Sequence, residues 1–183
     1  MENIWQGAKV RIRAAVPDDY VLYIDGDGNI NTDIERRFEK IDMPCTAQMR
    51  KIMIEKSIAA QRGDDFLFTV EDENKKPVGQ IVVFDTNLRM GSFKYGLFFV
   101  QEAQGKGYAS EAVKIVLDYY FNQLRYHKAN VYIYDFNTPS VKFHEKMGFV
   151  REGRLRQVAY IDGEYCDAVY YGMTSDEFCN MNK

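Results

Sequence analysis

The stretch Val100-Gln-Glu-Ala-Gln104-Gly105-Lys106-Gly107-Tyr108-Ala109 lies between two segments of different hydrophobic periodicity. Before it, Phe93-Lys-Tyr-Gly-Leu-Phe-Phe-Val100 is rich in aromatic residues and is typical of a β-strand. After it, apolar residues recur at intervals of three and four, which predicts one buried face of an amphipathic helix. These residues are Ala109, Ala112, Val113, Val116, Leu117, Tyr120, Phe121 and Leu124. The quoted stretch is therefore expected to be the turn of a strand–turn–helix unit.

The two glycines of this turn suggest a binding site for an anion. Gly105 and Gly107 carry no Cβ, so the backbone can turn tightly there and approach a ligand closely. The first turn of the helix has unpaired N–H groups and the positive end of the helix dipole. Together these features suit a phosphate or a pyrophosphate. A G-x-G pattern on its own is also compatible with a flexible turn that binds nothing.

Two common nucleotide motifs are absent from this region. A dinucleotide fingerprint needs a third glycine and an acidic residue about 20 residues further on. Here the third glycine position is Ser110, and Asp118 falls inside the predicted helix. The chain also lacks the G-x-x-x-x-G-K-[ST] pattern of P-loop proteins. Nicotinamide chemistry and nucleotide hydrolysis are therefore poorly supported.

Two motifs resemble those of the GNAT acetyltransferase superfamily. Gln104-x-x-Gly107-x-Ala109 resembles the Q/R-x-x-G-x-G/A signature that binds the pyrophosphate of acetyl-CoA in that family. The stretch from Asn137 to Phe149 resembles the family's N-x-x-A-x-x-L-Y-E-K-x-G-F pattern, and a predicted strand separates the two motifs. The resemblance covers roughly residues 8–173 and implies one GNAT domain over residues 1–183. The expected fold is α/β, with a mixed, mostly antiparallel sheet flanked by helices on both sides.

The resemblance implies direct transfer of an acetyl group from acetyl-CoA to a primary amine, with no acyl-enzyme and no metal. It assigns the pyrophosphate to the glycine turn, and the pantetheine arm to the end of the preceding strand and to Asn137. The residues expected to bind acetyl-CoA are Phe98, Phe99, Val100, Gln104, Gly105, Lys106, Gly107, Tyr108, Ala109, Asn137 and Lys146. For Asn137, a purely structural role at the end of a strand is also open.

Catalysis requires stabilisation of an oxyanion and removal of a proton from the attacking amine. A backbone N–H at Phe99 or Val100 is expected to stabilise the oxyanion that forms on the thioester carbon. An ammonium with a pKa of about 10 must lose its proton before it attacks. Glu102 and Asp85, both at predicted strand ends, are the candidate general bases. Acidic residues at strand ends are also common on any protein surface.

The position of the general acid departs from the family pattern. The residue before Glu145-Lys146 is usually a tyrosine, and here it is His144. An imidazolium can protonate a thiolate whose conjugate acid has a pKa of about 8.5. Since histidine has a pKa of about 6.5, this donor form would be lost as the pH rises. His144 is thus a candidate acid, with packing as the alternative, and Tyr132, Tyr134 and Tyr165 are candidate substitutes or walls of the acceptor site.

Composition limits the class of protein. The chain has 183 residues, 46% hydrophobic residues, a net charge of −3 and only three cysteines. This length and hydrophobic content suffice for a buried core, and the negative charge argues against a nucleic-acid surface. Sparse, odd-numbered cysteines indicate reduced thiols, and no apolar run approaches the ~20 residues of a membrane span. We therefore expect a cytoplasmic protein that binds neither nucleic acid nor a membrane.

Other elements follow from local patterns. Thr46 is expected to cap a helix that ends before Gly63 and buries Met49, Ile52, Met53 and Ala59. Further strands are expected at residues 10–15, 66–70, 78–84 and 129–135. Further helices are expected at 17–24, 33–41 and 139–148, and a final hairpin at 149–171 that turns at Asp162-Gly163. The segment Asp25 to Arg36 lacks the Gly and Glu that a calcium loop requires and is interpreted as a turn.

The identity of the acceptor is open at this stage. Residues 18–65 contain eleven acidic and seven basic residues, an excess that can attract a cationic amine or simply be a solvated surface. The stretches Glu152–Arg156 and Asp162–Asp167 resemble the branch of ribosomal-protein N-terminal and polyamine acetyltransferases. A small cationic amine, such as a polyamine or an aminoglycoside, and a peptide N-terminus are both candidates. The alternative to an enzyme is a non-catalytic acyl-CoA sensor, and a homodimer is left open.

Overall fold

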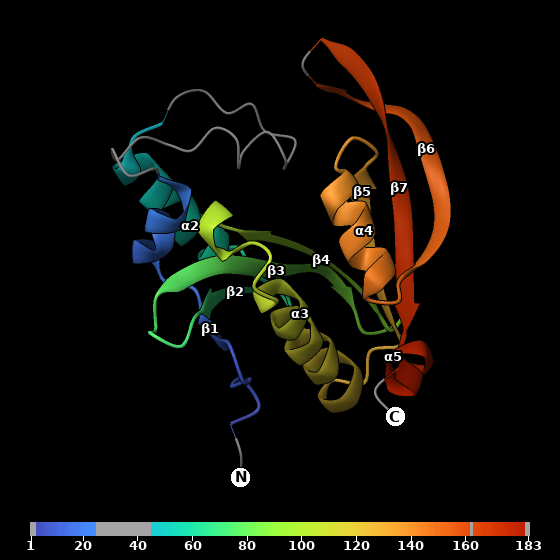
Figure 1. Cartoon of the computed structure of the whole chain (residues 1–183), viewed down its shortest axis with the longest axis horizontal. Coiled ribbons are helices and arrows are strands. Elements are labelled where there is room, and N and C mark those ends of the chain that lie inside the picture. The colour runs from blue at the N-terminus through green and yellow to red at the C-terminus, as the bar shows by residue number, and fades with distance from the viewer. Residues whose placement is uncertain (1–2, 25–44, 162, 182–183) are drawn as a thin grey trace. The chain divides into compact units, whose positions relative to one another are not determined.

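The computed structural model describes residues 3–24, 45–161 and 163–181. Figure 1 shows the order of the elements along the chain. The elements are β1 (Arg11–Ala14), η1 (Pro17–Tyr23), α2 (Ala47–Ala59), β2 (Phe66–Glu71), β3 (Pro77–Asn87), β4 (Ser92–Phe99), η2 (Gln101–Ala103), α3 (Tyr108–Asp118), η3 (Tyr119–Gln123), β5 (Lys128–Tyr134), α4 (Thr138–Lys146), β6 (Val150–Ile161), β7 (Glu164–Thr174) and α5 (Ser175–Met181). The helix η1 is of the 3-10 type and η3 is a π-helical turn that continues α3.

The strands form a seven-stranded sheet in the order β1-β2-β3-β4-β5-β7-β6. The β1–β2, β2–β3, β5–β7 and β6–β7 pairs are antiparallel. The β4–β5 pair is parallel, with Phe93 opposite Ala129. The expected GNAT fold, a mixed and mostly antiparallel sheet with helices, is therefore confirmed.

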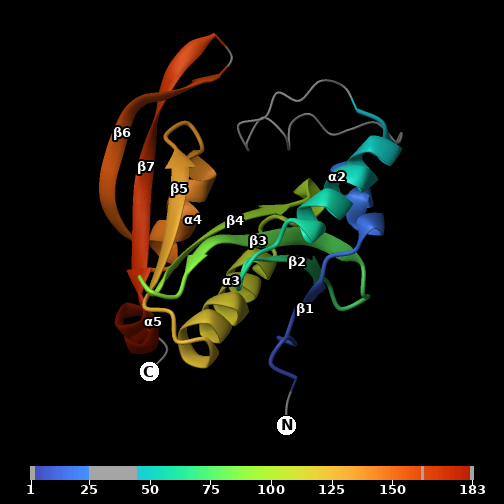
Figure 2. The same cartoon turned by 180° about the vertical axis from the view of Figure 1, so that it is seen from behind.

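Contacts divide the chain into two compact units. The first unit comprises Met1–Phe84 and Gly96–Tyr119, and the second comprises Asp85–Tyr95 and Tyr120–Lys183. In the first unit α3 lies beside β2 and β3 in both views (Figures 1 and 2). The face of α3 predicted from three-four spacing is buried, with Ala112 and Val113 fully enclosed. The Trp5 ring packs 5.3 Å from Phe68 and 4.6 Å from Tyr119, so the N-terminal segment adds to this core.

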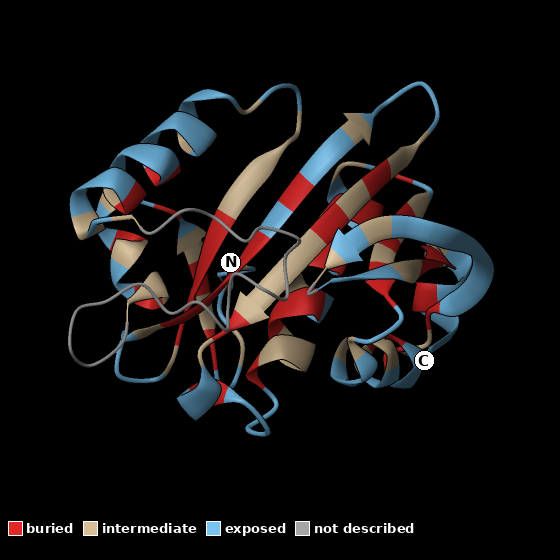
Figure 3. Ribbon diagram, turned by 90° about the horizontal axis from the view of Figure 1, so that it is seen from above, coloured by how far each residue is buried: buried red, intermediate tan, exposed pale blue. Residues whose placement is uncertain are grey.

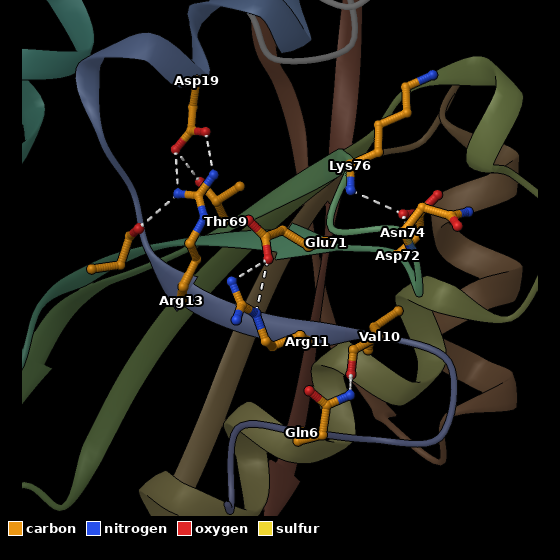
Figure 4. A network of polar contacts seen from close by, with 11 residues as sticks. Gln6, Val10, Arg11, Arg13, Asp19, Thr69, Glu71, Asp72, Asn74 and Lys76 are labelled. Carbon is orange, nitrogen blue, oxygen red and sulfur yellow. Dashed lines mark hydrogen bonds and ion pairs between the residues drawn. The ribbon is translucent and has the colours of Figure 1, made fainter.

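A polar network fixes η1 to β1 and β2 in the first unit (Figure 4). Arg13 donates to both carboxylate oxygens of Asp19, at 2.7 and 2.9 Å, and to Glu71 at 2.6 Å. The Thr69 hydroxyl donates to Asp19 at 2.7 Å. Burial raises the pKa of Asp19, but the hydrogen bonds from Arg13, Val16 and Thr69 outweigh it, and the net pKa is lowered. The carboxylate is therefore ionised and fully engaged.

The second unit has an aromatic core. The Phe93 ring lies 4.7 Å from Tyr120, 5.8 Å from Phe121 and 5.5 Å from Tyr126. In both views α4 lies beside β5 and β7 (Figures 1 and 2). Strand β6 is exposed over most of its length, and Figure 3 shows it largely in pale blue. The core of this unit is thus built on β5 and β7 and not on β6.

The structure corrects one sequence prediction and adds one element. Thr46 caps α2 as expected, accepting from the Met49 N–H at 3.2 Å. However, the residues buried on α2 are Arg50 and Ile54, while Met49 is 51% exposed, so the predicted buried face is wrong. The helix is rotated so that the Arg50 guanidinium lies over a tyrosine ring of η1, at 4.9 Å from its centre. Helix α5 was not anticipated, because its seven residues are too few for a clear period.

Several predictions fall outside the described residues. These are the helix at 33–41, the turn interpreted at 25–36, and Asp162 of the hairpin turn. Within the described ranges, no helix combines the length and apolar character needed to cross a membrane. The same described ranges contain no group of three His, Cys, Asp or Glu residues arranged to hold a metal ion.

Candidate active site

The glycine turn between β4 and α3 has the backbone that the sequence predicted. Gly105 and Gly107 have φ values of +75° and +85°, in the left-handed region that favours glycine. Gly107 is the N-cap of α3, and no side chain caps the helix there. A Cβ at Gly105 would meet nothing within 4 Å. The turn therefore leaves open space next to the uncapped N–H groups of the first helical turn, which fits a phosphate group.

The end of β4 is tied to this turn. The Gln104 side-chain amide donates to the Phe99 carbonyl at 3.4 Å. The Val100 N–H donates to the Val78 carbonyl at 3.0 Å. In this structure that N–H is already paired, so an oxyanion role for Val100 would require the bond to Val78 to open. Phe99 is nearly buried, at 9% exposure, and Phe98 is partly exposed.

Gly79 of β3 is a residue that the sequence analysis did not single out. A Cβ at this position would lie 2.5 Å from the Phe98 carbonyl oxygen and 2.6 Å from the Phe99 ring. Only glycine therefore permits this approach of β3 to the end of β4. A glycine inside an apolar strand pattern is a known sign of such close packing, and this signal was present in the sequence.

The remaining residues of the turn differ in exposure. Lys106 is exposed, and its ammonium lies 5.9 Å from the centre of the Tyr108 ring. Tyr108 is 9% exposed, so its ring packs into the first unit, and Ala109 is half-buried. Glu102 lies on the exposed turn η2. The structure thus brings together every predicted site residue between Phe98 and Ala109 in the first unit.

His144 lies on α4 in the second unit and is only 3% exposed. Its Nδ1 lies 2.8 Å from the Ser140 carbonyl oxygen, which can only accept, so Nδ1 carries the hydrogen. Its Nε2 is buried and has no hydrogen-bond partner in the described part of the chain. Burial lowers the pKa of His144 to about 4, against a smaller rise from the Ser140 hydrogen bond. The imidazole is therefore neutral at neutral pH, and the cationic form expected of a general acid is not populated there.

Two further predicted residues also belong to α4. The Asn137 side chain is its N-cap and accepts from the Ser140 N–H at 3.3 Å. This hydrogen bond gives Asn137 a structural role, and its amide nitrogen stays available as a donor to a ligand. Lys146 is exposed in the last turn of the helix.

The other candidates for proton transfer differ in their ion pairing, packing and exposure. The Asp85 carboxylate accepts from the Lys94 ammonium at 2.9 Å, which disfavours it as a free base. Tyr132 packs edge-on against Tyr134 at 5.2 Å. Tyr165 is 67% exposed on the final hairpin. Glu102 therefore remains the less encumbered of the two candidate bases.

A hollow also lies on the final hairpin of the second unit. A cavity of ≈ 650 Å³ is lined by Arg154, Leu155, Arg156, Gln157 and Asp167 of β6 and β7. Arg154 is paired there with Asp167 and Asp135. None of the residues predicted to bind acetyl-CoA lines this cavity, so the glycine turn is the better candidate site.

Comparison with known proteins gives the same assignment as the glycine turn. The model of the acetyltransferase (GNAT) domain matches residues 9–150. The chain belongs to the GNAT acetyltransferase family. It is 33% identical over 174 residues to the SPbeta prophage-derived uncharacterized N-acetyltransferase YokL of Bacillus subtilis, covering 95% of this chain and 94% of YokL.

Two further GNAT relatives have polyamine names. The spermidine N(1)-acetyltransferase of Vibrio cholerae is 30% identical over 116 residues, covering 63% of this chain and 67% of that protein. A solved structure of a Vibrio cholerae spermidine N-acetyltransferase with CoA and spermine has a TM-score of 0.79 to this chain, at 24% identity. It covers 95% of this chain and 100% of that one. The protein is therefore an acetyl-CoA-dependent N-acetyltransferase of the GNAT family.

Proposed function

We propose that this acetyltransferase transfers the acetyl group to a small cationic primary amine of the polyamine class. The observation that carries the proposal is the similarity to spermidine N(1)-acetyltransferase, at 30% identity over 116 residues. The acidic excess in residues 18–65 supports the same class, because a negative field raises the local concentration of a cationic amine. A net charge of −3 for the whole chain acts in the same direction.

Residues of the first unit are proposed to hold acetyl-CoA. Backbone N–H groups from Gly105 to Ala109 would bind the pyrophosphate, with Lys106 adding a positive charge. The backbone at Phe98 and Phe99, at the end of β4, would pair with the pantetheine arm. When bound, acetyl-CoA supplies a thioester whose carbonyl carbon accepts the amine. The Phe99 backbone N–H is the proposed donor to the oxyanion, because the Val100 N–H is paired with Val78.

Proton transfer is assigned to groups with a suitable protonation state. Glu102 is the proposed general base, since its carboxylate is exposed and Asp85 is paired with Lys94. His144 is buried and neutral, and its lowered pKa disfavours uptake of a proton as well as the cationic donor form, so no proton-transfer step is assigned to it. Asn137 and Lys146 are proposed as contacts to acetyl-CoA from α4. These roles are tested by substitution at each residue with CoA affinity and turnover measured separately.

The decisive experiment measures release of free CoA from acetyl-CoA with several acceptors offered side by side. The panel contains spermidine, spermine, an aminoglycoside and peptides with free N-termini. We expect turnover with the polyamines and little with the peptides. Faster turnover with a peptide than with the polyamines would contradict the proposed acceptor and favour the hypothesis of an N-terminal acetyltransferase.

The alternative of a non-catalytic sensor is separated by the same measurement. A sensor binds acetyl-CoA without releasing CoA for any acceptor. The specific observation that favours it is the replacement of the usual tyrosine by His144, which is buried and neutral. Tight binding of acetyl-CoA without turnover for the whole panel would support the sensor and contradict the enzyme.

A further inference from the structure

The glycine turn receives a second lysine from a distant part of the chain. Lys9 precedes β1, and its ammonium donates to the Lys106 carbonyl at 3.1 Å. A Cβ placed on Gly107 would lie 3.2 Å from the same ammonium. The two residues are separated by 97 positions in the sequence, and no motif connects them. Lys9 therefore lies directly at the turn that is suited to a phosphate.

Glu111 of α3 holds Lys9 in this place. Its carboxylate accepts three successive backbone N–H groups, from Ala8 at 2.8 Å, Lys9 at 2.8 Å and Val10 at 3.0 Å. A Cβ at Gly7 would lie 2.6 Å from the Glu111 carboxyl carbon, so a larger residue there would displace this carboxylate. Three hydrogen bonds to one carboxylate fix the backbone of the N-terminal segment against the first turn of the helix.

The charges around the turn indicate what this arrangement binds. In the described part of the chain, neither Lys9 nor Lys106 forms a salt bridge. Two unneutralised cations beside the positive end of a helix repel one another unless an anion lies between them. An ammonium has three N–H donors, and Lys9 uses one for the Lys106 carbonyl. Two donors are left for phosphate oxygens.

Acidic residues near the start of α3 increase the need for a further cation if the glycine turn is to bind an anion. Desolvation and the negative charges of Glu73 and Asp72 raise the pKa of Tyr108, at the start of α3. These carboxylates oppose the binding of an anion at the turn. Lys9 offsets part of that opposition, which the helix dipole and Lys106 would otherwise have to overcome alone.

We infer that Lys9 is a ligand of the CoA pyrophosphate and that Glu111 is the residue that positions it. This inference rests on the proposed use of acetyl-CoA at the glycine turn. It adds a contact from the N-terminal segment to a site otherwise built from the β4–α3 connection. The segment before β1 becomes part of the site.

Binding of CoA to the full-length protein tests this without any turnover. Isothermal titration calorimetry compares the wild type with Lys9→Met, which keeps the backbone N–H that Glu111 accepts. The matched control is Lys114→Met, because Lys114 is an exposed lysine of α3. We expect the Kd for CoA to rise roughly tenfold in Lys9→Met, as for loss of one charge-assisted hydrogen bond, and to stay unchanged in the control. The difference should shrink at high salt.

Shortened ligands identify the phosphate involved. The loss in Lys9→Met should persist with 3′-dephospho-CoA, which keeps the pyrophosphate, and should vanish with pantetheine, which lacks phosphate. Loss with CoA but not with 3′-dephospho-CoA would place Lys9 on the 3′-phosphate and overturn the assignment. Equal CoA affinity in Lys9→Met and wild type would overturn it as well. A wild type that binds no CoA would contradict the proposed function instead.

A second variant tests the positioning role. Glu111→Gln replaces one acceptor oxygen by an NH2 group that faces N–H donors. We expect it to weaken CoA binding by a similar factor, and the double variant with Lys9→Met to be no weaker than either single variant. Additive losses would mean that Glu111 does not act through Lys9. Unfolding curves of each variant check that the fold is retained.

Discussion

The hydroxyl of Tyr95 and the Nε2 of His144 are both buried without a hydrogen-bond partner in the described part of the chain. Their rings lie 5.8 Å apart, and the Phe149 ring packs against both, at 5.9 Å from Tyr95 and 5.3 Å from His144. Burial raises the pKa of Tyr95 well above its usual value and lowers that of His144 to about 4. Both groups are therefore neutral over the physiological range, in an environment that opposes charge on either.

The buried imidazole predicts a loss of stability in acid. In the unfolded chain His144 has a pKa of about 6.5, and in the folded protein it is about 4. As the pH falls from 6.5 to 4, the unfolded state takes up a proton that the folded state refuses, so stability decreases. The loss of stability due to this residue is about 3 kcal/mol, and the loss is complete below pH 4.

Urea unfolding between pH 7 and pH 4 measures this contribution, with His144→Phe as the comparison. The variant should lose the part of the pH dependence that belongs to the imidazole, while carboxylates contribute equally to both proteins. His127, which is exposed, supplies the control substitution His127→Phe. Parallel pH profiles for His144→Phe and the wild type would show that the imidazole is not held neutral in the folded state.

The close packing at Gly79 predicts a large effect of one methyl group. Gly79→Ala would bring a Cβ to 2.5 Å from the Phe98 carbonyl oxygen, so β3 or β4 must shift. We expect a loss of about 1–3 kcal/mol in the free energy of unfolding and weaker binding of acetyl-CoA. The control is Gly96→Ala in β4, whose Cβ would meet Val82 at an ordinary 3.6 Å. Equal stability of the two variants would contradict the steric argument.

The ion pair of Asp19 with Arg13 predicts that substitution of Asp19 lowers stability more than substitution of the neighbouring Asp18. Asp19→Asn leaves the Arg13 guanidinium without its bidentate partner in a site where the carboxylate is 3% exposed. Because Arg13 keeps 26% exposure, we expect a loss of roughly 2–3 kcal/mol, less than for a fully buried pair. Asp18→Asn is the control, since the Asp18 side chain is 76% exposed beside Lys51 and should change little. Thermal unfolding of both variants measures the two losses of stability, and equal losses would contradict the role of the Asp19–Arg13 pair.

The open space at the glycine turn predicts a specific loss of ligand binding. Gly107→Val places a branched side chain at φ +85°, next to the uncapped N–H groups of α3. We expect acetyl-CoA affinity to fall at least about tenfold, because the side chain would displace the Lys9 ammonium, which lies 3.2 Å from a Cβ at this position, and would take the space of a phosphate. Gly163→Val is matched in backbone strain, with φ +89° and open space around it, and should bind normally. Unchanged affinity in a folded Gly107→Val protein would contradict the placement.

The sequence by itself determined most of the elements and the family. The apolar spacing after Ala109 predicted the buried face of α3. Gly105 and Gly107 predicted a tight turn, and both have positive φ values in the structure. Asn137 was correctly placed at the junction of a strand and a helix. These features succeed because periodicity and turn chemistry act between residues a few positions apart.

Only the tertiary structure decided which side chains meet. The contact of Lys9 with the glycine turn joins residues 97 positions apart, and the contacts of Glu111 with residues 8–10 span about as far. The burial of His144 depends on Tyr95 and Phe149, and the buried face of α2 depends on the Tyr23 ring. Such contacts arise from the packing of distant segments, which shifts a pKa or buries an arginine without leaving a local period in the sequence.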